Sequence, residues 1–240
     1  MAQLAASNAV MYELAAENPN MTDLDRLTNL YWALCSTLRA GIPGDIVELG
    51  CNAGLTSVLL EMVLEAEGGT GRTLHLYDSF DGLPAPSPAD RYLKKGDCKA
   101  TEADVLAAFA RRDLRPPEIH AGWFEDSLPR HLPDRVAFAY LDGDFYESIL
   151  TGLTHVWPRL SPGGSVIVDD YCDRGLSPRA WDGLPGVKKA CDAFFADVPA
   201  GRRVLVGAGD LAFAEFRKTV ESRGAGGTGA APAPAPSPDR

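Results

Sequence analysis

The sequence predicts an α/β protein built on a doubly wound, mostly parallel seven-stranded sheet with a Rossmann-like arrangement and N-terminal helices. Three observations predict this fold class. Short apolar runs alternate with stretches of helical spacing, two helical blocks precede the first run, and a last pair of apolar runs follows the final helix. The 240 residues are 45% hydrophobic, which supplies enough apolar material for one main core.

The N-terminal region is expected to be helical. Apolar residues recur at helical spacing in two blocks within residues 8–38, and the blocks are separated at residues 18–20. Thr22 and Asp25 resemble a capping box at the start of the second block. The Gly and Pro residues of positions 41–44 then end the helical region.

The central region alternates between strands and helices. Strands are expected at Asp45–Leu49, Thr73–Tyr77, Glu118–Ala121, Val136–Leu141 and Ser165–Val168. Helices are expected at Thr56–Glu67, Ala103–Arg112, Ser148–Arg159 and Val187–Phe195. This order specifies parallel strands joined by right-handed crossovers. The last two strands, Arg203–Val206 and Ala212–Arg217, are expected to pair antiparallel.

The chain divides into three expected parts. Residues 1–40 form an N-terminal helical segment that packs on the core, and residues 41–222 form the main domain. Beyond Ser222 the content of Gly, Ala and Pro rises sharply and the apolar periodicity ends. Residues 223–240 are therefore expected to be a disordered tail.

Composition narrows the classes of partner and compartment. The net charge of -10 disfavours binding to nucleic acid, whose phosphates repel an acidic protein. The five cysteines are scattered singly, so neither a disulfide framework nor a zinc-thiolate site is expected. The sequence contains no apolar stretch long enough to cross a bilayer, and its start does not resemble a secretion signal. We therefore expect a cytoplasmic protein without membrane partners.

The turn after the first expected strand has the features of a nucleoside site. Gly50 and Gly54 allow a tight strand-to-helix turn close to a ligand, although an ordinary turn would also use them. The turn carries no basic residue, which argues against a bound pyrophosphate. Glu48 instead offers an anion to a cationic ligand. S-adenosylmethionine fits this description because it carries an ammonium and a sulfonium group.

The next two strand ends extend this expected site. Asp78 can accept hydrogen bonds from ribose hydroxyls, and Trp123 and Phe124 can pack against an adenine, although packing in the core would also explain the two aromatic residues. The full expected set of donor-binding residues is Glu48, Gly50, Cys51, Asn52, Gly54, Thr56, Ser57, Asp78, Ser79, Gly122, Trp123, Phe124, Asp126, Ser127 and Asp142.

Four carboxylates follow the fourth and fifth expected strands. Asp142 and Asp144 end one strand, and Asp169 and Asp170 end the other, so all four should meet at one edge of the sheet. They would repel one another without a cation, and all-oxygen ligands favour Mg²⁺ or a similar divalent ion. The alternative is that some of them only cap the following helices.

The carboxylates suggest a division of roles. Asp142, Asp169 and Asp170 are the expected metal ligands, and Asp144 is the expected general base. A cation held there would lower the pKa of an acceptor hydroxyl and fix its oxygen in line with a methyl group. The pattern therefore predicts an O-methyltransferase.

A set of motifs resembles one known family, and the motifs occur in the same order as in that family. They are Gly41-Ile42-Pro43-Gly44-Asp45 with Glu48 and Gly50, Tyr77-Asp78-Ser79-Phe80-Asp81-Gly82-Leu83-Pro84, Gly122-Trp123-Phe124-Glu125-Asp126-Ser127-Leu128-Pro129, Leu141-Asp142-Gly143-Asp144-Phe145-Tyr146-Glu147-Ser148, Leu160-Ser161-Pro162-Gly163-Gly164, Asp169-Asp170-Tyr171 and Gly186-Val187-Lys188-Lys189-Ala190. Together they resemble the macrocin O-methyltransferase family from about Met21 to Lys218. Its members include enzymes that methylate sugar hydroxyls of macrolide and aminocoumarin antibiotics.

The resemblance implies a class I methyltransferase fold, with residues 41–222 as the S-adenosylmethionine-dependent domain. It also implies Mg²⁺ at positions matching Asp142, Asp169 and Asp170, and a general base matching Asp144. A small polyhydroxyl acceptor and a homo-oligomer, with N-terminal segments that help to close the active site, are further expectations. Two alternatives stay open: a metal-dependent methyltransferase of catechols or phenols, and a non-catalytic nucleoside-binding domain.

Overall fold

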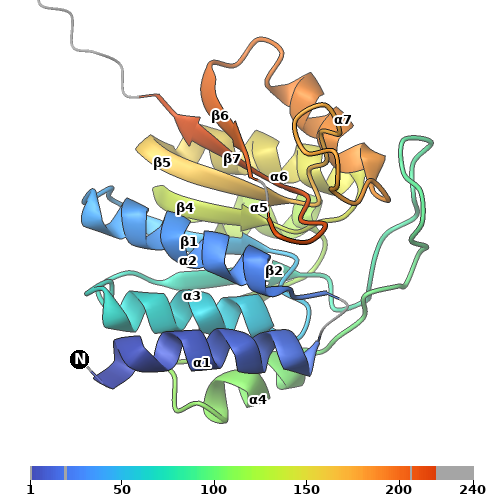
Figure 1. The fold of residues 1–240 in the computed structure, drawn as a ribbon. Helices are drawn as coiled ribbons and strands as arrows, with labels where there is room; N and C mark the ends of the chain where they lie inside the picture. The colour runs from blue at the N-terminus through green and yellow to red at the C-terminus, as the bar shows by residue number, and fades with distance from the viewer. Residues whose placement is uncertain (1, 19–20, 206, 220–240) are drawn as a thin grey trace, which may run out of the picture.

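The seven strands form one sheet in the order β3-β2-β1-β4-β5-β7-β6 (Figure 1). The computed structural model describes residues 2–18, 21–205 and 207–219. The strands are β1 (Asp45–Leu49), β2 (Leu74–Asp78), β3 (Glu118–Ala121), β4 (Val136–Leu141), β5 (Leu160–Asp169), β6 (Ala200–Val204) and β7 (Phe213–Lys218). All pairs from β3 to β5 are parallel, and β7 pairs antiparallel with both β5 and β6. The predicted fold class is confirmed.

Helices cover both faces of the sheet. They are α1 (Ala2–Glu17), α2 (Leu24–Arg39), α3 (Leu55–Ala66), α4 (Glu102–Ala110), α5 (Phe124–His131), α6 (Tyr146–Arg159) and α7 (Pro185–Phe194). Helices α1 to α4 share one hydrophobic core with one sheet face, and α5 to α7 share a second core with the other face. Among the described residues, no helix combines the length and apolar content that a membrane span requires.

The helical segment before the sheet is packed rather than detached. Leu14 of α1 and Leu27, Leu30 and Leu34 of α2 are fully buried in the first core. The predicted cap of α2 is wrong by one residue: the N-cap is Asp23, not Thr22, and its side chain accepts a hydrogen bond from the backbone N–H of Arg26. An Asp at this position satisfies an amide that would otherwise lack a partner.

The observed elements differ from the prediction mainly at one helix and at element ends. Helix α5 is not among the predicted helices; it is short and contains Pro129, so its helical signal is weak. Strand β5 begins at Leu160, earlier than predicted, because Leu160 already pairs with Val136 of β4; the register then shifts, and regular pairing resumes between Ser165 and Phe138. Val206 and the expected tail, residues 223–240, lie outside the described residues, as do residues 19–20.

The crossing from β1 into the turn that follows it depends on a glycine. Gly50 has φ of 86°, and a Cβ at this position would lie 1.9 Å from the backbone oxygen of Asp142. The backbone N–H of Asp142 also donates to the oxygen of Leu49 at 2.8 Å. The ends of β1 and β4 are therefore in direct backbone contact, which leaves no room for any side chain at position 50.

We predict that Gly50→Ala lowers the free energy of unfolding by at least about 2 kcal/mol, because the added Cβ must displace the backbone after β4. Urea unfolding followed by circular dichroism measures this. Gly71→Ala is the matched control, since nothing lies within 4 Å of a Cβ there, and its effect should stay within about 0.5 kcal/mol. Equal unfolding midpoints for the two variants would contradict the packing argument.

Candidate active site

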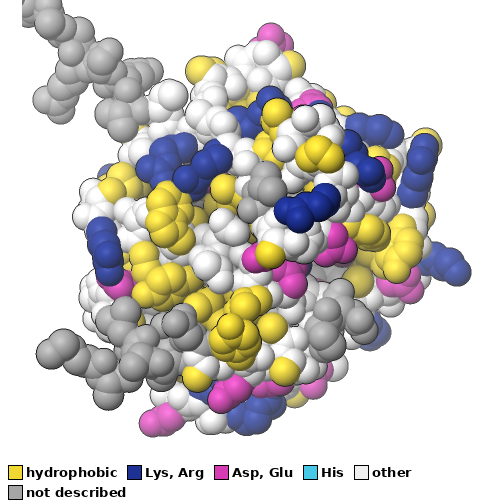
Figure 2. Space-filling view, viewed as in Figure 1, with side chains coloured by type: hydrophobic (Ala, Val, Ile, Leu, Met, Phe, Trp, Pro, Cys, Tyr) yellow, Lys and Arg dark blue, Asp and Glu magenta, His cyan; other side chains and the backbone are white. Residues whose placement is uncertain are grey.

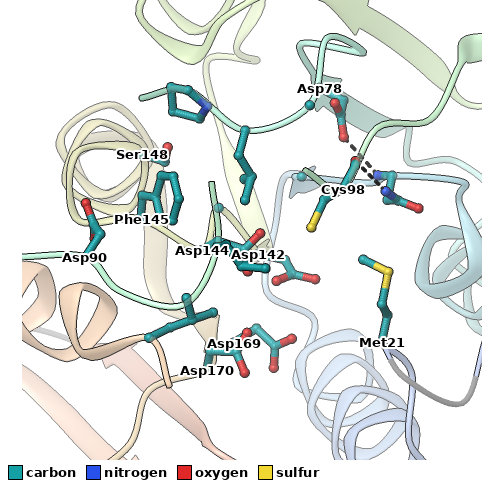
Figure 3. Close-up of a pocket in the computed structure, with 18 of the residues that line it drawn as sticks. Met21, Asp78, Asp90, Cys98, Asp142, Asp144, Phe145, Ser148, Asp169 and Asp170 are labelled. Carbon is teal, nitrogen blue, oxygen red and sulfur yellow. Dashed lines mark hydrogen bonds between the residues drawn. The ribbon is translucent and has the colours of Figure 1, made fainter. Parts of the chain in front are cut away.

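The carboxyl ends of β1, β2, β4 and β5 border one cavity of about 1140 Å³. The start of α2, the loop of residues 79–101 and the loop of residues 171–184 complete its walls. Figure 3 shows the carboxylates that follow β4 and β5 gathered in one part of the cavity, with Asp78 in another. Strand ends at a switch in strand order are the usual ligand site of an open α/β sheet.

Three carboxylates meet inside this cavity. Oxygens of Asp142, Asp144 and Asp170 lie within 4.8 Å of one another. The backbone of Asp144 has φ of 58° and that of Asp170 has φ of 54°, a left-handed conformation that Asp adopts more readily than most residues. Such conformations cost energy and persist only where the surrounding fold holds them in place. They are concentrated at functional sites.

The grouping differs from the predicted division of roles among the four carboxylates. Asp144, the expected base, lies within the cluster of possible ligands, whereas Asp169 is only 3% exposed. Oδ1 of Asp169 accepts a hydrogen bond of 2.6 Å from Nε of Arg26. One oxygen of Asp169 is therefore already bound to a guanidinium group, and its second oxygen is the one that could bind a ligand.

The cluster is electrostatically unfavourable when it is fully ionised. Burial, together with the charge of Asp169, raises the pKa of Asp144 to about 7. Burial and neighbouring carboxylates also raise the pKa values of Asp142 and Asp170 above their ordinary range. Added positive charge at this position would favour the ionised forms. The donor set of clustered carboxylate oxygens fits a hard divalent cation such as Mg²⁺.

Arg26 supplies positive charge to the cluster from α2. Its guanidinium pairs with Asp23 and Asp169, and its Nη2 lies 3.6 Å from Oδ1 of Asp170. Burial disfavours the charged guanidinium, but Asp169 and the other nearby groups outweigh burial and raise the pKa of Arg26. The N-terminal helical segment thus contributes a charged residue to the cavity wall.

Asp78 ends β2 with its carboxylate held in a fixed orientation. Its Oδ2 accepts from the backbone N–H of Asn52 and its Oδ1 from that of Phe80, both at 2.9 Å. The side-chain amide of Asn52 donates to the oxygen of Cys98 at 2.7 Å, which ties the turn after β1 to the 79–101 loop. Figure 3 shows the hydrogen bonds at Asp78 and Cys98 as dashed lines, apart from the carboxylate cluster. Burial raises the pKa of Asp78.

About half of the predicted donor-binding residues line the cavity. Those that line it are Gly50, Asn52, Asp78, Ser79, Trp123, Phe124 and Asp142. Those that are not among its lining residues are Glu48, Cys51, Gly54, Thr56, Ser57, Gly122, Asp126 and Ser127. Gly54 is the N-cap of α3, with φ of 79°, and lies against Val105 of α4.

Glu48 lies beneath the turn rather than in the cavity wall. It is fully buried, and its carboxylate accepts hydrogen bonds from the hydroxyls of Thr56 and Ser57 on α3. The three predicted residues are therefore brought together, but they bind one another. Burial raises the pKa of Glu48 to about 7, although the two hydroxyls act in the opposite direction.

Several cavity residues were missed by sequence reasoning. Arg26 and Met21 come from the N-terminal region, Cys98 and Tyr92 from the 79–101 loop, and Trp181 from the loop after β5. The rings of Tyr92 and Trp181 meet edge to face at 5.1 Å between centroids. Only the family-like motif at the start of the 79–101 loop marked that segment, and no local pattern marked Arg26.

Comparison with known proteins gives one family. The sequence profile described as Macrocin-O-methyltransferase (TylF) matches residues 13–189. Over 161 residues the chain is 41% identical to the 8-demethyl-8-(2,3-dimethoxy-alpha-L-rhamnosyl)-tetracenomycin-C 4'-O-methyltransferase of Streptomyces olivaceus, which covers 63% of this chain and 62% of that protein. It is 35% identical over 164 residues to the Mycinamicin III 3''-O-methyltransferase of Micromonospora griseorubida, covering 63% of this chain and 65% of that protein. The matched region thus spans under two thirds of either relative.

A solved structure extends the similarity to the fold. The O-methyltransferase NovP superposes with a TM-score of 0.72 at 29% identity, and the match covers 84% of this chain and 82% of NovP.

We predict that Glu48 makes stability depend on pH. Its pKa in the folded protein, about 7, lies above the ordinary value of 4.5, so the folded state binds the extra proton between these values and loses stability as pH rises through them. The loss attributable to Glu48 should approach roughly 3 kcal/mol above the folded pKa.

The measurement is urea unfolding of the wild type and Glu48→Gln from about pH 5 to about pH 8. Because Gln keeps the shape and does not ionise, the difference in unfolding free energy between the two proteins should change with pH. A difference that stays constant over this range would show that Glu48 does not have the assigned pKa.

Proposed function

The chain belongs to the macrocin O-methyltransferase family, and from this premise we propose that it transfers a methyl group from S-adenosylmethionine to a hydroxyl of a small polyhydroxylated acceptor. One observation carries the proposal: a single cavity contains both an oriented carboxylate at the end of β2 and a cluster of carboxylates at the ends of β4 and β5. The carboxylate at the end of β2 suits a nucleoside, and the cluster suits a hydroxyl activated by a cation. The fold, a class I methyltransferase fold, is consistent with this use.

The donor is proposed to bind across the ends of β1 and β2. Asp78 would accept hydrogen bonds from the ribose hydroxyls, and its two backbone donors already fix its orientation. Trp123 and Phe124 border the same cavity and offer apolar surface to the adenine. Gly50 lets the backbone approach the donor closely, since no side chain fits there.

The carboxylate cluster is proposed to hold a divalent cation. Asp142 and Asp170 would supply ligands, together with the second oxygen of Asp169. When bound, such a cation supplies Lewis acidity that lowers the pKa of an acceptor hydroxyl. By holding the cation, Asp142 and Asp170 would fix the acceptor hydroxyl so that its oxygen faces the methyl group of the donor. That orientation favours in-line transfer of the methyl group.

Asp144 is proposed as the general base. Burial and the neighbouring Asp169 raise its pKa to about 7 when no cation is bound, so Asp144 binds a proton more readily than an ordinary carboxylate does. In the reaction the acceptor oxygen attacks the methyl carbon, the carbon–sulfur bond breaks, and the hydroxyl proton passes to Asp144. Asp169, which pairs with Arg26, lies close enough to raise the pKa of Asp144.

The acceptor is proposed to be a sugar or a similar polyhydroxyl group of a natural-product intermediate. The relatives named above are O-methyltransferases whose names include a rhamnosyl tetracenomycin and a mycinamicin. Tyr92 and Trp181 add an aromatic wall to the cavity, and aromatic faces pack well against the C–H face of a sugar ring.

We also propose that the chain works as a homo-oligomer in the cytoplasm. Tyr12 of α1 and Trp32 of α2 are exposed by 64% and 50%. Figure 2 shows hydrophobic side chains gathered over the face that these helices form. Such a face suits contact with a second copy. The five cysteines are free, which suits a reducing compartment.

We predict that a chelator abolishes methyl transfer and that added Mg²⁺ restores it.

Asp144→Asn should still bind donor and cation but lower kcat by about 10²- to 10⁴-fold, because the base is lost. Transfer of a labelled methyl group to sugar-bearing acceptors and to catechols measures this and separates the two acceptor classes. Asp81→Asn is the matched control, since Asp81 is exposed in the 79–101 loop. An unchanged kcat in Asp144→Asn would remove Asp144 from this role.

We predict that Asp78→Ala weakens donor binding by roughly 10- to 100-fold, because charge-assisted hydrogen bonds to the ribose are lost. Calorimetric titration with S-adenosylmethionine gives the affinity. Binding of the cation should be preserved in this variant, and Asp81→Ala should bind the donor like the wild type. Wild-type donor affinity in Asp78→Ala would argue against a ribose contact.

A further inference from the structure

A second group of possible metal ligands lies on the β2 and β3 side of the sheet. Parallel pairing places His75 of β2 opposite Glu118 of β3 and places Tyr77 opposite His120. Residues two apart on a strand share a face, so His75, Glu118 and His120 all project from the same face. One ligand atom from each lies within 4.8 Å of the others.

The distances within this group match those of a small tetrahedral site. Nδ1 of His75 lies 3.0 Å from Nε2 of His120 and 3.5 Å from Oε2 of Glu118. A tetrahedral Zn²⁺ with bonds of about 2.0–2.1 Å separates neighbouring ligand atoms by about 3.3 Å. Two imidazoles and one carboxylate are a common Zn²⁺ ligand set, with the fourth position left to water. Without a cation the two imidazole nitrogens hydrogen-bond to each other, and a bound cation would replace that hydrogen bond.

The surroundings favour neutral, well-oriented histidines. Burial lowers the pKa of His75, and burial and the neighbouring His75 and His131 lower that of His120, so both are available as neutral ligands at neutral pH. The ring of His120 stacks against those of Tyr77, His75 and His131, which limits its rotation. Oδ2 of Asp45 lies 3.9 Å from Nε2 of His75 and adds negative charge behind the ligand.

Solvent can reach the group from the edge of the sheet. The Glu118 side chain is 61% exposed, whereas that of His75 is 10% exposed, so a cation would enter past Glu118 and meet the buried imidazole last. His75 precedes Asp78 by three residues of extended strand, about 10 Å, which separates this group from the donor side of the cavity. None of the three residues lines that cavity.

We propose that His75, Glu118 and His120 form a second metal site that takes Zn²⁺ or a cation of similar preference and clamps the edge strand β3 to β2. The strand is only four residues long and is followed directly by Gly122, Trp123 and Phe124. A cation shared by the two strands stabilises the edge of the sheet beside the expected adenine wall. This site is independent of the carboxylate cluster and of the proposed methyl transfer.

The test is titration of the full, chelator-treated chain with Zn²⁺, followed by calorimetry and by thermal unfolding. The wild type should bind one Zn²⁺ equivalent more than Glu118→Gln and His120→Gln. At a free Zn²⁺ concentration of about 100 times Kd, the Tm of the wild type should rise by about 5–10 °C more than that of the variants. His155→Gln on α6 is the matched control and should behave like the wild type.

Co²⁺ absorption separates this site from the carboxylate cluster. Two nitrogen ligands in a tetrahedral site give intense visible bands, whereas an all-oxygen octahedral site gives weak ones. The wild type should show the intense bands and Glu118→Gln should lose them. Because Glu118 is exposed, this variant folds even if His120→Gln does not. Equal Zn²⁺ stoichiometry and equal Co²⁺ spectra in the wild type and Glu118→Gln would overturn the proposal.

Discussion

The concentration of negative charge at the ends of β4 and β5 is the constraint on which the site depends. Two strands deliver four carboxylates to one place, and ionised groups this close cannot all be buried without compensation. Arg26 provides part of that compensation from a helix that precedes the sheet. The same ion pair joins α2 to the end of β5. The charge balance of the cavity therefore depends on the packing of the N-terminal helices.

The strand order decides where this charge can be used. Because β1 lies between β2 and β4, the end of β1 is where the Asp78 side of the cavity, proposed to bind the nucleoside, meets the carboxylate side. Gly50 occupies that junction with its backbone against Asp142. A larger residue at position 50 would push the ends of β1 and β4 apart. The distance between a donor bound on one side and an acceptor bound on the other would then increase. Backbone packing thus sets the spacing on which transfer would rely.

Features with a local signal were predictable from the sequence, and features set by distant contacts were not. Strands β1, β3 and β4 were predicted at their observed bounds because apolar runs end at Gly, Asp or Pro residues. Asp78 and the carboxylates followed from their positions at strand ends. Arg26 contacts a residue 143 positions away, which no local pattern reveals. The surroundings of Glu48 were not predictable, because strand position does not show that two hydroxyls on α3 bind its carboxylate.

The Arg26 contact also limits how this protein can be recombined with others. Exchanging N-terminal segments between related enzymes is an attractive way to change which acceptor is accepted, since those segments form part of the cavity wall. In this chain such an exchange replaces the charged side chain of Arg26 as well as part of the cavity wall. A chimera whose incoming helix lacks an arginine at the position of Arg26 would leave Asp169 buried without its partner, and would need a compensating change on β5.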